Sequence, residues 1–188
     1  GPRYVATYAD LCKVGTGADG WTLDASYVQT ADIQCPAGGV FPMIGFVGSG
    51  ANPWDNDIGK FTGTYDGQGH TISNLQLNGS DEYLIGLFRA LGSSATVQDV
   101  GLTNVTGGNE NCDYIGSLTG FSDGTIRGCS ATGTLVGSSY FGGLVGVARS
   151  GTISDCAIEI VITGGTQTGG LIGVIGHDES PLVITNCT

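Results

Sequence analysis

Basic residues are scarce in this sequence. Lysine and arginine together number six in 188 residues, against 17 aspartates and glutamates, which gives a net charge of −11. Nucleic-acid binding depends on basic side chains that contact phosphates, so nucleic acid is excluded as a partner. No apolar run reaches the roughly 18 residues that a membrane-spanning helix needs, so the chain does not insert directly into a membrane. The sequence also lacks Cys-x-x-Cys and paired histidines, which argues against a zinc site.

Glycine, in contrast, is abundant. The sequence has 35 glycines and only five prolines, well above the usual glycine share of about 7%. No Gly-X-Y period is present, so a collagen helix is excluded. The glycines lie at the junctions between repeated units, as expected of a chain that turns a corner several times per coil.

One unit recurs along the chain. Phe141-Gly-Gly-Leu-Val-Gly146 is followed by Gly151-Thr-Ile-Ser-Asp-Cys156, and related copies span 115–129 and 168–187. Equivalent leucines recur about 26 to 31 residues apart, in the range of solenoid repeats: Leu87, Leu118, Leu144 and Leu171. Two further columns of apolar or thiol residues are predicted to face the core: Ile72, Val97, Ile126, Ile153 and Ile184, then Leu75, Val100, Cys129, Cys156 and Cys187.

Within each copy the apolar residues alternate, which favours short strands over a helical face. Stacked units of this kind bury one continuous interior. The sequence therefore predicts an all-β fold, a parallel β-helix (β-solenoid) of about four to five coils. A short capping helix is expected within residues 4–14, with Thr7 as N-cap and Asp10 completing a capping box.

We expect one β-solenoid domain over residues 1–188. Residues 1–60 form an irregular N-terminal cap region, and residues 61–188 form the coils. Because solenoids normally end in a distinct capping unit and none is evident here, the sequence is expected to be a fragment of a longer protein.

The unit Phe141-Gly-Gly-Leu-Val-Gly146 with Ile153-Ser-Asp-Cys156 resembles the GLUG motif of bacterial and archaeal surface proteins. That motif occurs in large adhesins and in regions flanking IgA-specific metallopeptidases. Three upstream segments resemble the stretch that commonly precedes such repeats: Ala31-Asp-Ile33, Pro42-Met-Ile-Gly45 and the segment from Phe61 to Leu75. Together the resemblance covers nearly the whole chain. It implies an extracellular β-helical stalk or adhesive module, and it carries over no catalytic residue. The six cysteines depart from that pattern.

Two functions follow as expectations. The first is a non-catalytic module of a cell-surface adhesin or secreted surface protein, which acts as a stalk or binds a host or cell-surface protein or glycan. The alternative is a carbohydrate-binding or polysaccharide-degrading β-helix. Such an enzyme needs basic residues and carboxylates gathered in one groove. Here the basic residues are scattered in sequence, although Arg127 and Arg149 could approach each other in adjacent coils.

Four aromatic residues near predicted turns are the candidates for glycan binding, because their ring faces could stack on sugars: Trp54, Tyr83, Tyr114 and Tyr140. The alternative is that Tyr114 and Tyr140 simply pack between coils. Of the two histidines, His70 is predicted to be a turn or core residue and His177 to lie in a solvated loop.

Two acidic loops offer the oxygen ligands that calcium prefers. Their candidate ligands are Asp55, Asp57, Glu110 and Asp113; the alternative is plain surface charge. Neither loop matches an EF-hand or a nonapeptide calcium repeat. Calcium is therefore the candidate ion, and no cofactor is required.

An even number of cysteines in an extracellular protein argues for disulfides. Cys12 and Cys35 bracket the N-terminal region and form a natural pair. Adjacent rungs lie about 4.8 Å apart, within the range of Cα separations that a disulfide tolerates. Cys112–Cys129 with Cys156–Cys187 is one solution, and stacked, buried thiols are the alternative.

Overall fold

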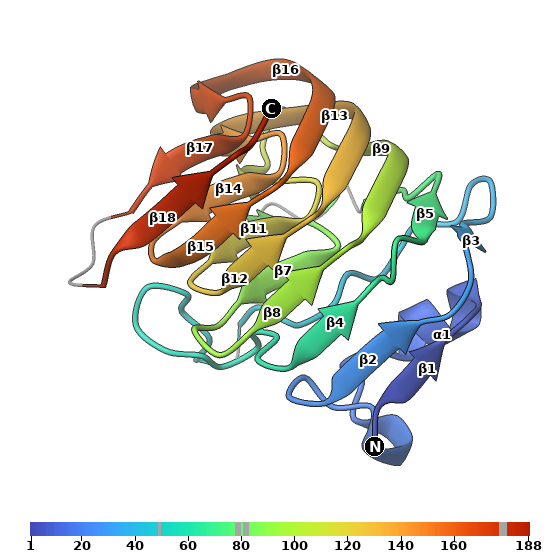
Figure 1. The fold of residues 1–188 in the computed structure, drawn as a ribbon. Helices are drawn as coiled ribbons and strands as arrows, with labels where there is room; N and C mark the ends of the chain where they lie inside the picture. Colours follow the sequence, from blue (N-terminus) through green and yellow to red (C-terminus); the bar gives the residue numbers. More distant parts are fainter. Residues whose placement is uncertain (49, 78–79, 81–82, 177–179) are drawn as a thin grey trace.

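Parallel strands stack into three sheets that wind around one axis (Figure 1). The computed structural model describes residues 1–188 except 49, 78–79, 81–82 and 177–179. It is 51% strand and 5% helix. The predicted all-β parallel solenoid is therefore confirmed.

The first sheet has seven strands. In spatial order these are β1 (Arg3–Val5), β2 (Ser26–Gln29), β4 (Thr64–Asp66), β8 (Thr96–Gln98), β12 (Thr125–Arg127), β15 (Gly151–Ser154) and β18 (Leu182–Thr185).

The second sheet turns a corner of the coil. One part contains β3 (Ile33–Gln34), β5 (Thr71–Ser73), β9 (Gly101–Gly108), β13 (Ser130–Gly142) and β16 (Ala157–Gly169). The last residues of β13 keep their pairing with β16 but pair on the other side with β10 (Asp113–Ile115) in place of β9, and β10 in turn pairs with β6 (Tyr83–Ile85). The third sheet contains β7 (Phe88–Leu91), β11 (Thr119–Ser122), β14 (Val145–Ala148) and β17 (Ile172–Ile175).

The stack has about six turns, more than the four to five coils predicted. The difference arises in the N-terminal region, which lacks the glycine-marked unit. Strands β1 and β2 nevertheless pair in parallel with each other, and β2 pairs with β4, so the first sheet begins at Arg3.

The predicted capping helix is present as α1 (Tyr8–Lys13). The Asp10 N–H donates to Thr7 Oγ1 at 3.1 Å, and the Thr7 N–H donates to the Asp10 carboxylate at 3.1 Å, which completes the capping box. The Asp10 carboxylate also accepts from the Ala6 N–H at 3.0 Å, and this bond, with smaller contributions from Thr7, lowers the pKa of Asp10 because it stabilises the charged form. Leu11 is fully buried in the main core, so α1 covers the first end of the solenoid.

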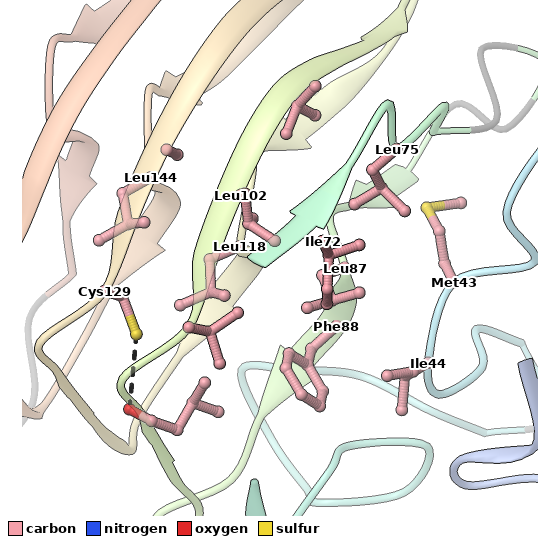
Figure 2. Close-up of a cluster of buried hydrophobic side chains, with 14 of the residues drawn as sticks. Met43, Ile44, Ile72, Leu75, Leu87, Phe88, Leu102, Leu118, Cys129 and Leu144 are labelled. Atoms are coloured by element: carbon pink, nitrogen blue, oxygen red, sulfur yellow. Dashed lines mark hydrogen bonds between the residues drawn. The ribbon is translucent and has the colours of Figure 1, made fainter. Parts of the chain in front are cut away.

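The repeated leucines line the interior, as predicted. Leu87, Leu118 and Leu144 are fully buried, and Leu171 packs against them at the far end. The Leu118 N–H donates to the Leu144 carbonyl, and the Leu144 N–H donates to the Leu171 carbonyl, at 3.1 and 3.0 Å. Figure 2 shows Leu87, Leu118 and Leu144 in successive coils of this dry core.

One predicted column stacks as expected except at its first member, and faces the core except at its last member, Ile184, which is 39% exposed. Val97, Ile126, Ile153 and Ile184 pair in register along the first sheet. Val97, however, pairs with Tyr65 in the preceding coil, whereas Ile72 lies in the second sheet between Ile33 and Leu102. Leu75 lies just after β5, and its carbonyl accepts from the Thr106 N–H of β9, so it also belongs to this side of the coil. The segment at 70–75 resembles the repeat in sequence but occupies the next side of the coil.

Candidate functional site

The four candidate aromatic residues come together on the outside of the solenoid. Tyr114 and Tyr140 occupy equivalent places in adjacent coils and stack, with ring centroids 4.5 Å apart and an interplanar angle of 17°. Tyr83 meets Tyr114 edge-on at 4.9 Å. Trp54 belongs to the loop that precedes the regular coils, and its indole Nε1–H donates to Tyr114 Oη at 3.1 Å. We call these four residues the aromatic column.

The backbone explains why these rings face outward. Leu84, Tyr114 and Tyr140 all have a positive φ, of 56°, 58° and 52°. They hold the same register position in β6, β10 and β13. A left-handed residue bends the strand at a corner of the coil and takes its side chain out of the main core. The tyrosines instead pack on a second apolar cluster, which includes Ala90, Phe121 and Val147.

The three tyrosines are partly exposed. Burial, together with the neighbouring Tyr114, raises the pKa of Tyr83 to about 12. Tyr83 therefore stays a neutral phenol at physiological pH and can both donate and accept hydrogen bonds.

A buried ionic group lies beside the aromatic column. The Asp123 carboxylate accepts from Arg149 Nε and Nη2 at 2.8 and 2.7 Å, from Lys60 Nζ at 3.1 Å and from Ser150 Oγ at 3.2 Å. The side chains of Lys60 and Asp123 are only 2% and 4% exposed. Lys60 also forms an ion pair with Asp57 at 3.1 Å.

Electrostatics set the charge state of this group. Burial acts to raise the pKa of Asp123, but the hydrogen bonds from Arg149 and the adjacent Lys60 charge outweigh it, so the pKa is lowered overall. Both cations also lie over the ring of Phe121, at 5.0 and 5.3 Å from its centroid. Asp123 is therefore a charged, saturated hydrogen-bond acceptor at neutral pH.

A polar pocket of about 370 Å³ opens above these residues; we call it the ionic pocket. It is lined by Asp55, Asn56, Asp57, Lys60, Ser93, Asp123, Arg149, Ser150 and Ser180. Arg149 joins the pocket to the aromatic column, because its guanidinium lies over the Trp54 ring and donates to the Trp54 carbonyl. The two features form one continuous surface.

The structure separates the four candidate calcium ligands into two places. Asp55 and Asp57 line the ionic pocket, which also holds the cations Lys60 and Arg149. Asp113 instead accepts from Ser139 Oγ at 2.6 Å, and Glu110 is an exposed turn residue. Within the described ranges, no group of three or more His, Cys, Asp or Glu side chains gathers to hold a metal. Calcium binding stays a prediction.

The six cysteines form no disulfide in the structure. For Cys12 and Cys35, the natural pair, burial and to a smaller extent the nearby Cys12 raise the pKa of Cys35 to about 11. Cys129 and Cys156 share a hydrogen bond in adjacent coils. The proposed Cys112–Cys129 pair does not correspond to the stacking, because the residue above Cys129 is Val100, whereas the Cys112 carbonyl accepts from the Ser138 N–H.

The histidines take no part in this site as far as the structure describes them. His70 follows a turn, and its Nδ1 lies 3.2 Å from the Asp32 carboxylate. His177 lies outside the described residues.

The buried ionic group around Asp123 was not predicted from the sequence. Arg149 does not meet Arg127; the Arg127 guanidinium hydrogen-bonds to Gln98 instead. A signal was present in the repeats, since Ser122 pairs with Ala148 and the next residues are Asp123 and Arg149. Lys60 gave no such signal, because it precedes the regular units.

The fold and this surface define a parallel β-solenoid with a joined aromatic and ionic site. No protein-family model matches the chain, and no solved structure matches it. The chain is similar to halomucin of Haloquadratum walsbyi (strain DSM 16790 / HBSQ001), with 39% identity over 150 residues. The match covers 77% of this chain, which spans about 2% of the length of that relative. Over the described residues, no helix has the length and apolar character needed to cross a membrane.

Proposed function

We propose that this chain is a non-catalytic module of a cell-surface or secreted protein, and that the aromatic column with the ionic pocket binds a glycan. The observation that carries the proposal is the joining of Trp54, Tyr114 and Tyr140 to a pocket rich in carboxylates and hydroxyls. The similarity to part of halomucin supports the cell-surface or secreted location.

The resemblance to GLUG-motif surface proteins belongs to the same proposal. In such a protein the stacked coils serve as a stalk or an adhesive surface. The regular parallel pairing from β4 to β18 supports this role, because a stack of coils extends along one axis and presents equivalent positions on its flank.

The chemistry of the site suits a sugar better than a simple ion. Ligand pockets combine aromatic surface with a few polar groups that fix orientation. Here the ring faces of the aromatic column offer flat apolar surface, and Asp55, Asp57 and Ser93 offer hydrogen-bonding groups at the rim. The positive charges of Lys60 and Arg149 would repel a bound metal ion. The carboxylates of Asp55 and Asp57 would repel a strongly anionic ligand.

The state of Asp123 supports binding without catalysis. General acid–base catalysis needs a group that gains and loses protons near the working pH. Asp123 already accepts from Lys60, Arg149 and Ser150, and its lowered pKa holds it in the charged form. Its geometry suits a structural anchor for the pocket.

The test is a glycan array probed with the purified chain, followed by reducing-sugar assays on every glycan that binds. Tyr140→Ala removes the outer ring of the stacked pair, so we expect at least about a tenfold loss of affinity, equivalent to about 1.4 kcal/mol. Tyr4→Ala is the matched control, because Tyr4 is an exposed ring, 61% accessible, on the first strand. It should leave binding unchanged.

Each result decides something. Release of reducing ends would overturn the non-catalytic assignment. If the chain binds no glycan but binds a surface protein, and Tyr140→Ala abolishes that binding, then the ligand of the aromatic column is a protein and not a glycan. Equal losses of affinity in Tyr140→Ala and Tyr4→Ala would show that the aromatic column is not part of the binding surface.

A further inference from the structure

Three cysteines form a column at one corner of the solenoid. Cys129, Cys156 and Cys187 each follow a first-sheet strand by two residues, and those strands, β12, β15 and β18, pair in register. The Ala157 N–H donates to the Cys129 carbonyl at 3.0 Å, and the Thr188 N–H donates to the Cys156 carbonyl at 2.9 Å. The three residues are therefore neighbours along the stack. We call them the thiol column.

The side chains meet as well as the backbones. The Cys156 thiol shares a hydrogen bond with Cys129 on one side and with Cys187 on the other. Cys129 Sγ also contacts the Val97 carbonyl at 3.8 Å (Figure 2), and Cys187 Sγ contacts the Ile153 carbonyl at 3.8 Å. Cys129 and Cys187 thus each reach a carbonyl of the preceding coil, and all three sulfurs also contact the carbonyl two residues earlier in their own coil.

Geometry makes Cys156 the shared member. Adjacent parallel strands lie about 4.8 Å apart, and a disulfide accepts Cα separations of about 4.4 to 6.8 Å. Cys156 can therefore bridge to either neighbour. Cys129 and Cys187 are two rungs apart, about 10 Å, which is too far for a direct bond.

Accessibility differs along the column. Cys129 and Cys156 are each only 2% exposed, whereas Cys187 is partly exposed. A reagent from solvent therefore meets Cys187 first. The hydrogen bond from Cys129 lowers the pKa of Cys156 to about 7 despite the opposing effect of burial. The same hydrogen bond raises the pKa of Cys129, and burial raises the pKa of Cys187, so Cys156 is the most readily ionised thiol of the column.

We propose that Cys129, Cys156 and Cys187 form a thiol–disulfide exchange site for small disulfides, in which one protein disulfide is shared by three thiols and always includes Cys156. This inference does not depend on the glycan-binding proposal, because it concerns a different corner of the coil.

The exchange proceeds in balanced steps. The Cys187 thiolate attacks one sulfur of a small disulfide, RSSR, and releases one RS⁻, which leaves a mixed disulfide on Cys187. The Cys156 thiolate then attacks Cys187 Sγ and releases the second RS⁻. Two electrons pass from the cysteines to the small disulfide, and the two cysteine protons end on the released thiols.

A third step moves the bond inward without further oxidation. The Cys129 thiolate attacks Cys156 Sγ, forms Cys129–Cys156 and releases the Cys187 thiolate. Either bridge links two neighbouring coils covalently. The buried Cys129–Cys156 bridge also withdraws the disulfide from solvent reductants.

The test uses the full chain, reduced, desalted and then equilibrated with oxidised glutathione. Samples are quenched in acid, and bridges are mapped by peptide mass spectrometry. We expect Cys156–Cys187 to form first and Cys129–Cys156 to follow, with no Cys129–Cys187. Peptides with Cys12, Cys35 and Cys112 are followed separately.

Matched variants separate the steps. Cys156→Ser removes every bridge in the thiol column, whereas Cys129→Ser retains Cys156–Cys187. Cys187→Ser still permits Cys129–Cys156, but at least about tenfold more slowly, because the exposed thiol is gone. Cys156→Ala replaces Cys156→Ser if the buried hydroxyl disturbs folding, with circular dichroism as the check.

The proposal is wrong if Cys129–Cys187 forms, or if Cys156→Ala leaves a bridge between the two remaining thiols. It is equally wrong if all three stay reduced while Cys12 and Cys35 oxidise in the same sample. In that case the thiol column is simply buried packing.

Discussion

At the scale of single residues, Asp123 is the most tightly held polar group in the candidate site. Replacing it by Asn leaves Lys60 and Arg149 buried without their shared carboxylate. Breaking a buried ion pair in this way typically costs about 3–5 kcal/mol. We therefore expect Asp123→Asn to lower the free energy of unfolding by that amount in urea titrations. Asp19→Asn is the control. Asp19 forms an ion pair with Lys13, but its side chain is 82% exposed, so losing this pair should cost less than about 1 kcal/mol.

The pH dependence follows from the lowered pKa of Asp123. A carboxylate with a lowered folded-state pKa contributes stability above its unfolded value, near about 4, and loses it as pH falls through the folded pKa. Wild type should therefore lose stability below about pH 4 more steeply than Asp123→Asn. Asp10 and Asp32, whose pKa values are also lowered, remain in both proteins. Parallel pH curves for the two proteins would show that Asp123 contributes nothing to acid sensitivity.

At the scale of elements, β13 illustrates how glycine permits close stacking. Pairing with β9 shifts register between Ala131 and Gly133. Gly133 has φ of +145°, and a Cβ placed there would lie 2.0 Å from the Val105 carbonyl oxygen. Since the obstacle is backbone, the coil must shift, and Gly133→Ala should destabilise by about 2–3 kcal/mol.

The measurement is a urea midpoint shift at constant slope. Gly170→Ala is the control, because its φ is ordinary and a Cβ there meets nothing within 4 Å. It should change stability by no more than about 0.5 kcal/mol. A similar loss in both variants would mean that the cost at Gly133 does not come from the close approach of Val105.

The same elements show what sequence periodicity can predict. The leucine column from Leu87 to Leu171 was predictable because its members recur at a similar spacing beside glycines, even in the degenerate copy that contains Leu87. Ile72 was misplaced because a Thr-Ile-Ser segment fits two different sides of the coil equally well, and only pairing with Leu102 distinguishes them. The sequence did not predict that β1 and β2 belong to coils of the solenoid, because the junctions beside them lack the repeated glycine motif.

At the scale of the whole molecule, the site was only half predictable. The tyrosines belong to the repeats, so their positions could be aligned in advance. Trp54 and Lys60 come from the preceding irregular segment, and only the folded path brings them against Tyr114 and Asp123. A local pattern contains no information about where such a segment crosses the stack.

The two ends of the stack differ, and this difference predicts a gradient of local stability. At the first end, Val5 of β1 and Leu11 of α1 are fully buried. At the other end, the last strands leave large apolar side chains exposed, with Val161 at 62% and Ile175 at 63%. In a solenoid each coil is stabilised mainly by its neighbours, so a coil with one neighbour opens at lower free energy.

In hydrogen exchange of the 188-residue chain, amides of β17 and β18 should exchange first. Those of β11 and β12 should exchange only with global unfolding, and β1 should be better protected than β18. Equal protection of β1 and β18 would contradict capping by α1, and uniform exchange along the chain would mean that the coils unfold as one cooperative unit.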